Sequence, residues 1–142
     1  MATITRADTL TGAKKKTEYF SDFMDNFDKN PFGNQLAKIT NEKAVSQSIK
    51  NLILTNSGER PFQPYIGTNV YNLLFEPNFT DSADLVEKLI RNCIENNEPR
   101  AIIQEIIFPE QRDEYSIQIT IVYNVINNPE PVNLTLVLKR VR

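Results

Sequence analysis

The sequence predicts an α+β domain in which helices pack on one face of a small antiparallel sheet, preceded by an extended N-terminal arm. Apolar residues recur at helical spacing between about residues 41 and 94, and after Arg100 the period changes to two. Helices that are grouped before the strands, rather than alternating with them, favour an α+β fold. A chain of 142 residues is long enough for one such domain with its own core.

The N-terminal part divides into two segments by composition. Residues 1–18 are polar and rich in Thr and Lys, so we expect a flexible arm, with residues 19–142 forming a single domain. An aromatic-rich stretch opens that domain, and its spacing fits neither a helix nor a strand. It could fold its aromatic side chains onto the domain, or it could dock onto another subunit. The aromatic residues are Tyr19, Phe20, Phe23 and Phe27.

Two helices are predicted from their N-caps and apolar rows, and a short helix is expected between them over residues 67–75, with Val70, Leu73 and Leu74 inward. The first begins after Asn41 as N-cap and runs to about Leu54. The second begins after Asp81 as N-cap and runs to Ile94. Its apolar residues form two adjacent rows, Leu85, Val86, Leu89, Ile90, Cys93 and Ile94. Because Cys93 lies in the middle of this stripe, we interpret it as a core residue rather than a reactive thiol.

Three strands follow. Residues 102–108 are mostly apolar, as is typical of a strand covered on both faces. Residues 115–125 alternate, with Ile117, Ile119, Ile121, Tyr123 and Val125 on one face. In the last strand the inward residues are expected to be Val132, Leu134, Leu136 and Leu138.

The composition excludes several classes of function. The chain has no histidine, which excludes Ser-His and Cys-His catalysis and histidine-ligated zinc. With one cysteine it can form no internal disulfide and no cysteine metal cluster, and we expect no cofactor or metal. A net charge of −2 gives no sign of nucleic-acid binding, and no apolar run is as long as a membrane span.

The tripeptide Glu98-Pro99-Arg100 joins the last predicted helix to the first strand. Proline fixes its own φ and disfavours helical conformation for the preceding residue, so the helix should end at Glu98. We expect the two charged side chains to be displayed from this stiff junction, where they could bind a neighbour by charge-assisted hydrogen bonds. The alternative is an ordinary helix-to-strand corner with a surface ion pair.

The C-terminal strand ends in a cationic cluster, Lys139-Arg140-Val141-Arg142. A terminal strand at a sheet edge exposes backbone donors and acceptors that a strand of another protein can use. The cations could discourage unspecific pairing at this edge. They could also guide a specific partner of opposite charge.

Several segments together resemble the baseplate wedge proteins of contractile-tail phages, the sheath-initiator family, with relatives in type VI secretion baseplates. The resemblance lies in the helix of residues 40–55, in Gly58-Glu59-Arg60-Pro61-Phe62, in Gly67-Thr68-Asn69-Val70, in Leu73-Leu74-Phe75-Glu76 and in Glu98-Pro99-Arg100. It covers about residues 19–142. The name "lysozyme-like" has been attached to this family, although its members look structural.

The resemblance implies a structural subunit of the virion tail baseplate, assembled in the host cytoplasm. Its implied partners are other wedge subunits, including their helical core bundle, and the tail sheath protein, with tail tube and hub proteins as further candidates. Glu98, Pro99 and Arg100 would contact the core bundle, and Gly58, Glu59, Arg60, Pro61 and Phe62 would also take part in protein interactions. The edge that includes Leu136, Leu138, Lys139 and Arg140 would start the first sheath ring by strand pairing.

Two alternatives to this function stay open from the sequence. One is a carboxylate-dependent, lysozyme-like enzyme acting on peptidoglycan, with Glu59 or Glu98 as its protonated carboxyl. Such an enzyme needs two carboxyl groups in one cleft, and the linear spacing indicates no such pair. The other is a general protein-interaction module outside any tail.

Overall fold

A three-stranded antiparallel sheet forms the centre of the protein. In this computed structural model, residues 17–70, 73, 79–108 and 116–139 are described. The sheet has the order β3-β4-β5, built from β3 (Ala101–Ile107), β4 (Ser116–Val125) and β5 (Pro131–Lys139). The long central strand β4 therefore pairs on both sides, while β3 and β5 are the two edges.

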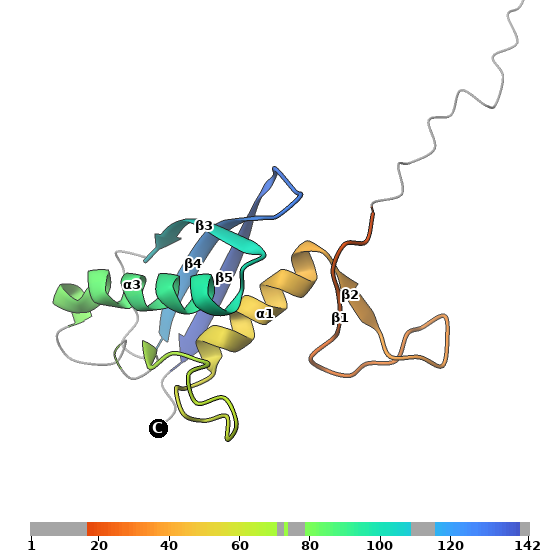
Figure 1. Cartoon of the computed structure of the whole chain (residues 1–142), viewed down its shortest axis with the longest axis horizontal. Helices are drawn as coiled ribbons and strands as arrows, with labels where there is room; N and C mark the ends of the chain where they lie inside the picture. The colour runs from red at the N-terminus through yellow and green to blue at the C-terminus, as the bar shows by residue number, and fades with distance from the viewer. Residues whose placement is uncertain (1–16, 71–72, 74–78, 109–115, 140–142) are drawn as a thin grey trace, which may run out of the picture.

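Two helices cover one face of this sheet, as Figure 1 shows. Helix α1 (Glu42–Leu54) contacts β5, α3 (Phe79–Asn97) contacts β3, and the two helices contact each other. The expected α+β architecture is thereby confirmed. The opposite face of the sheet carries the exposed side chains of β5, among them Asn133, Thr135 and Val137.

The core lies between the helices and the sheet. All five predicted inward residues of β4 are buried, and the helices contribute Val45, Ile49, Val86, Ile90 and Ile94. Tyr123 is fully buried, and its hydroxyl lies 2.6 Å from the Ser46 hydroxyl of α1. This bond satisfies a polar group inside the core and ties the first helix to the central strand.

The structure differs from two predictions about burial. On α3 one apolar row is buried, but Leu85 and Leu89 of the other row are 52% and 36% exposed. On β3, Ile102 and Ile107 are 55% and 44% exposed, so this strand is covered on one face only. For β3 the reason is that the helices lie on only one face of the sheet, and a bulge between Ile103 and Glu105 shifts the alternation of the strand.

The helix ends also differ from the predicted caps. Helix α3 begins at Phe79, so Asp81 lies within the helix rather than at its N-cap. Asn41 does hold the N-cap position of α1, with φ of 51°, but its side chain makes no capping hydrogen bond. Its carboxamide instead binds the backbone of the segment that precedes β1. It accepts a hydrogen bond from the N–H of Tyr19 at 2.9 Å and donates one to the carbonyl of Thr17 at 2.9 Å.

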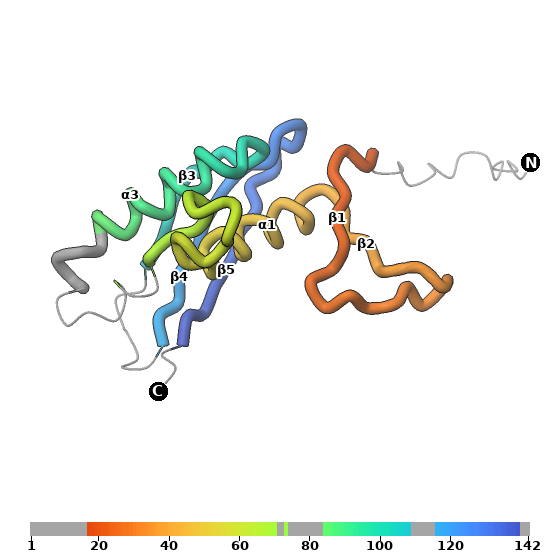
Figure 2. Tube along the Cα trace, turned by 60° about the horizontal axis from the view of Figure 1, so that its bottom comes forward, coloured from red at the N-terminus to blue at the C-terminus, as the bar shows by residue number. Residues whose placement is uncertain are grey.

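A hairpin precedes α1 and projects away from the sheet and helices (Figures 1 and 2). It contains two short strands, β1 (Ser21–Phe23) and β2 (Lys38–Thr40), which pair antiparallel. From here on, "the arm" means residues 17–41, which form this hairpin, and not the flexible segment predicted for residues 1–18. Of the arm's aromatic residues Phe20 packs against the core, whereas Tyr19, Phe23 and Phe27 are exposed. The expected flexible segment 1–18 falls almost entirely outside the described residues.

Gly67 lies where the loop after α1 returns to the helix end. Its φ is +108°, and a Cβ added there would lie 2.4 Å from the carbonyl oxygen of Thr55. We expect Gly67→Ala to lower the free energy of unfolding by about 2–4 kcal/mol, because both the backbone conformation and the contact disfavour a side chain. Chemical denaturation measures this change.

Gly33→Ala is the matched control, because a Cβ at Gly33 would meet nothing within 4 Å. Its effect should stay within about 0.5 kcal/mol. Equal stability of the two variants would contradict the account of this loop.

Candidate interaction site

The Glu98-Pro99-Arg100 junction forms an internal ion pair. Arg100 Nε lies 2.5 Å from Glu98 Oε1, and Arg100 Nη2 lies 2.6 Å from Glu98 Oε2. The guanidinium therefore binds the carboxylate through two parallel hydrogen bonds, the strong bidentate geometry of such pairs. Helix α3 ends at Asn97 and β3 begins at Ala101, so the tripeptide is the whole turn between them.

The two charged residues differ in exposure. The Glu98 side chain is 3% exposed and that of Arg100 is 35% exposed. Burial alone raises the pKa of Glu98, but hydrogen bonds from Arg100 and Ser48 and the charge of Arg100 outweigh it, so this pKa is lowered. The carboxylate is thus ionised inside the protein and held by its neighbour.

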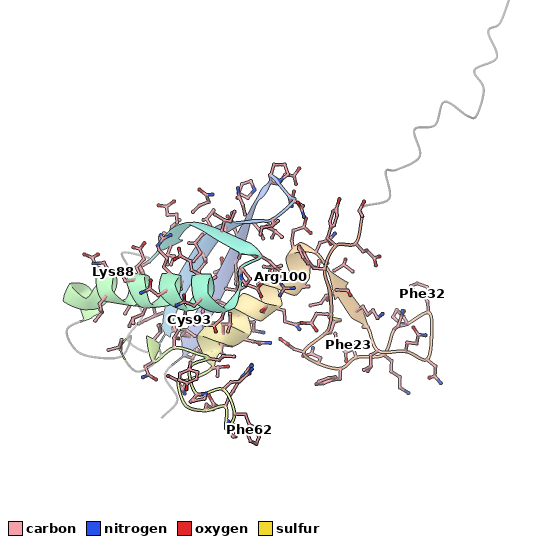
Figure 3. The ribbon with its side chains drawn as sticks, viewed as in Figure 1. Phe23, Phe32, Phe62, Lys88, Cys93 and Arg100 are labelled. Atoms are coloured by element: carbon pink, nitrogen blue, oxygen red, sulfur yellow. The ribbon has the colours of Figure 1, made fainter. Side chains whose placement is uncertain are left out.

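Arg100 also contacts the arm. Its guanidinium carbon lies 5.3 Å from the ring centre of Phe20, within the range of a cation–π contact. Figure 3 places Arg100 between the helices and the hairpin. The side chain therefore links the end of α3 to the root of the arm. No local pattern in the sequence relates residue 20 to residue 100, so this contact could not be predicted.

The expectation that both charges are displayed is only half right. Glu98 is buried, and its carboxylate already accepts hydrogen bonds from Arg100 and Ser48. Pro99 is exposed and Arg100 is partly exposed. A neighbouring protein can therefore reach Pro99 and one edge of the guanidinium, but not the carboxylate.

The Gly58-Glu59-Arg60-Pro61-Phe62 segment lies in a loop that closes on itself. The N–H of Thr68 donates to the carbonyl of Thr55 at 2.8 Å, and the N–H of Gly58 donates to that of Pro64 at 3.0 Å. Gly58 has φ of +86°, and all five residues of the segment are exposed. Phe62 is 97% exposed and, as Figure 3 shows, stands at the far end of the loop. This loop holds an aromatic side chain in solvent, away from Arg100.

The backbone of β5 has an open side, which follows from the register of the sheet. The N–H of Ile126 donates to the carbonyl of Arg100 at 2.9 Å, so even-numbered residues of β4 direct their backbone groups to β3. Odd-numbered residues of β4 must then bond to β5, where their partners are Val132, Leu134, Leu136 and Leu138. The N–H and C=O groups of Asn133, Thr135 and Val137 therefore point away from the sheet.

The open side of β5 has no backbone partner among the described residues. The opposite edge is different: Arg91 of α3 donates to the carbonyl of Ile103 at 3.5 Å, and the bulge interrupts β3. Bulges and covering side chains are devices that discourage strand addition. Of the two edges, β5 is thus the better template for a partner strand.

The predicted edge residues divide accordingly. Leu136 and Leu138 are 6% and 3% exposed, so their side chains belong to the core and only the strand that carries them lies at the edge. Lys139 is exposed, and Arg140 lies outside the described residues. The outward residues Asn133, Thr135 and Val137 were missed as site residues, although they are the positions between the predicted inward residues Val132, Leu134, Leu136 and Leu138.

Two pockets among the described residues lack a pair of carboxylates. A cavity of about 130 Å³ next to Asn41 is lined by one carboxylate, Glu42, and a larger groove beside α3 is lined by none of the described carboxylates. The described residues include no cluster of His, Cys, Asp or Glu that could hold a metal ion. The described helices include none that is long and apolar enough to cross a membrane.

The ion pair makes a prediction about pH. In the native protein the lowered pKa of Glu98 contributes stability above the pKa of the unfolded chain, and this stability is lost as the pH falls through the folded pKa. Arg100→Ala leaves a buried carboxyl without its cation, so its pKa should rise and stability should fall as the pH rises from about 4 to 7. At pH 7 we expect a loss of about 1–3 kcal/mol, limited by the partial exposure of Arg100.

Thermal unfolding at several pH values measures this dependence. The matched control is the double variant Glu98→Gln/Arg100→Ala, which has no carboxyl at position 98, so the additional loss of stability between about pH 4 and 7 that Arg100→Ala shows should be absent. Arg100→Ala with the same pH profile as the native protein would contradict the account of the pair.

Comparison with known proteins identifies the family. Residues 40–130 match the family model "Baseplate wedge protein gp25". The chain is similar to baseplate wedge protein gp25 of Enterobacteria phage T4, with 31% identity over 90 residues, which is 63% of this chain and 68% of the phage protein. The matched region begins at residue 40, so most of the arm precedes it.

Two solved structures share the fold. A crystal structure described as a tail lysozyme from Geobacter sulfurreducens aligns with a TM-score of 0.63 and 24% identity, over 71% of this chain and 92% of that one. The cryo-EM structure of the anti-feeding prophage baseplate, 6-fold symmetrised, contains a chain that aligns with a TM-score of 0.59 and 18% identity, over 87% and 88%. Since the family model covers more than half of the sequence, the chain belongs to the baseplate wedge protein gp25 family.

Proposed function

We propose that this protein is a structural subunit of a contractile-tail baseplate that holds neighbouring wedge subunits and starts the tail sheath by strand pairing. The observation that carries the proposal is the open side of β5, where Asn133, Thr135 and Val137 present backbone donors and acceptors at one of the two edges of the sheet. A sheath subunit would add a strand there.

Strand addition at this edge fits the physics of nucleation. Each backbone hydrogen bond contributes modestly, about 0.5–1.5 kcal/mol net. Several such edges arranged in a ring by an assembled baseplate would hold the first sheath subunits at high effective concentration. The entropy lost on arranging these subunits in a ring would then be offset by the baseplate before the sheath polymerises. Sheath subunits alone in solution lack that arrangement.

Two other surfaces are proposed to bind wedge subunits. Pro99 and the exposed edge of Arg100 offer a rigid contact next to the end of α3, and a core-bundle helix is the proposed partner. The loop of residues 55–68 offers Phe62 and Arg60 from a closed backbone, which limits the entropy lost on binding. Tail tube and hub proteins are further candidate partners, and assembly is proposed to take place in the host cytoplasm.

The alternative is a lysozyme-like enzyme, which we do not favour. A general acid needs a raised pKa, whereas the pKa of Glu98 is lowered and its carboxylate is held by Arg100. Glu59 is exposed and accepts a hydrogen bond from the N–H of Asn56, without a cleft around it among the residues that line the described cavities.

The edge proposal predicts the effect of proline at β5. Thr135→Pro removes an N–H that points away from the sheet, so the fold should survive, but the variant cannot donate to an added strand. We expect baseplates that carry it to form a first sheath ring about tenfold less often or worse, as counted by electron microscopy.

Two further variants control for the side chain and for the fold. Thr135→Val keeps the N–H and should nucleate sheath normally, whereas Leu136→Pro removes a bond to β4 and should unfold the domain. Normal sheath formation on folded Thr135→Pro baseplates would overturn strand pairing at this edge.

The enzyme alternative makes its own prediction. The purified protein should leave the turbidity of a peptidoglycan suspension unchanged over hours, at concentrations where a lysozyme clears it. Clearing that is abolished by Glu59→Gln or by Glu98→Gln alone would replace the structural function with the enzymatic one.

A further inference from the structure

The arm exposes more apolar side chains than a hairpin of its size can bury. Phe23, Phe27 and Phe32 are 48%, 69% and 97% exposed, and Tyr19 and Leu36 are 60% and 39% exposed. A two-stranded hairpin has no second layer against which to pack these groups. Aromatic side chains gathered on a projecting element are typical of a binding surface.

Contacts with α1 fix the direction of the arm. The side-chain carboxamide of Gln47 pairs with the backbone of the arm as a neighbouring peptide group would. It donates to the carbonyl of Phe23 at 2.8 Å and accepts from the N–H of Asp25 at 3.2 Å. The Asp25 carboxylate accepts a hydrogen bond from Asn51 at 3.2 Å and lies 3.7 Å from the ammonium of Lys50. These bonds anchor one side of β1 along the helix.

The root and the tip of the arm are also held. At the root Arg100 covers the ring of Phe20, and the carboxamide of Asn41 binds the chain on either side of residue 18. At the tip Asn30 accepts from the N–H of Phe32 at 3.0 Å through its side chain, and its own N–H donates to the carbonyl of Gln35 at 2.8 Å. Phe32 is thus presented on a tight turn at the end farthest from the sheet, as Figure 3 shows.

The charge of the arm indicates the chemistry of its partner. The arm, residues 17–41, contains four carboxylates, Glu18, Asp22, Asp25 and Asp28, and two cations, Lys29 and Lys38, so it is acidic on balance and its carboxylates all lie before Lys29. Residues 30–37, around Phe32, contain no charged residue. A partner surface that fits this pattern has an apolar groove for the aromatic rings. It also has basic residues on the side that faces the acidic segment, residues 17–28.

We propose that the arm is a pre-oriented docking element that inserts Phe27 and Phe32 into an apolar groove, bordered by Lys or Arg, on a different protein of the baseplate. The inference rests on the proposed baseplate function. Because the arm is already fixed by Gln47, Asn51 and Arg100, little conformational entropy remains to be lost on docking. The arm mostly precedes residues 40–130, which the family model matches, so this contact is proposed in addition to those of the matched region.

Site-specific photo-crosslinking in assembled, purified particles tests the proposal. A benzophenone amino acid replaces Phe32 in one particle preparation and Leu85, an exposed apolar residue of α3, in another. We expect the Phe32 probe to form crosslinks at one site of a different baseplate protein, with Lys or Arg near the crosslinked residue, and the Leu85 probe to form none at that site. Mass spectrometry of the crosslinked peptides identifies the site.

Three results would overturn the proposal. Crosslinks from the Phe32 probe only to a second copy of this chain would assign the arm to self-association. An absence of crosslinks in particles that contain the chain would leave the arm without a partner, while the baseplate function itself stands. A chain that is not incorporated into particles at all would remove both the inference and the proposed function.

Incorporation measured in competition with the native chain gives an independent readout. The double variant Phe27→Ser/Phe32→Ser should be incorporated at least about tenfold less well, with an unchanged melting temperature because both rings are exposed. Phe27→Leu/Phe32→Leu keeps apolar side chains and should recover most of this loss. Equal incorporation of the serine variant and the native chain would contradict the proposal.

Discussion

The pairing register of β4 with β5 is the constraint on which the rest of the structure depends. It places Leu136 and Leu138 under the helices and, by the same alternation, directs the backbone groups of Asn133, Thr135 and Val137 outward. A slip by one residue would expose the buried leucines and bury polar side chains, so the register is strongly specified. The open edge therefore follows from the packing of the hydrophobic core, which determines which backbone N–H and C=O groups of β5 a partner strand can reach.

A second, electrostatic constraint sets the geometry on the opposite side of the molecule. The Glu98 carboxylate is buried and ionised, and the bidentate contact with Arg100 makes this tolerable inside the protein. Because the same guanidinium covers Phe20, the turn between α3 and β3 and the root of the arm are joined through one side chain. The Glu98-Pro99-Arg100 tripeptide, which was predicted to contact a neighbouring protein, thus makes contacts within its own chain. The parts that a neighbour can reach are Pro99 and one edge of Arg100.

Much of the fold could be predicted from the sequence, because helical and strand periods report burial directly. The alternation in β4 identified its five buried residues, and α1 ends at Leu54 as the pattern indicated. Features that depend on distant residues could not be predicted. The bulge in β3, the exposed row of Leu85 and Leu89, and the contact between Phe20 and Arg100 all follow from tertiary packing. The same holds for the site: Glu98 was identified by its motif, but its hydrogen bond with Ser48 of α1 joins residues 50 positions apart and has no local signal in the sequence.

A reconstruction of the assembled baseplate with its first sheath ring, at a resolution that traces the backbone, tests the central claim most directly. The account predicts that a strand of a sheath subunit lies along β5 within hydrogen-bonding distance, with its N–H and C=O groups paired to those of Asn133, Thr135 and Val137. It would be contradicted if this edge in the intact tail were covered by another segment of the same chain, or were bare while the sheath contacts a different surface.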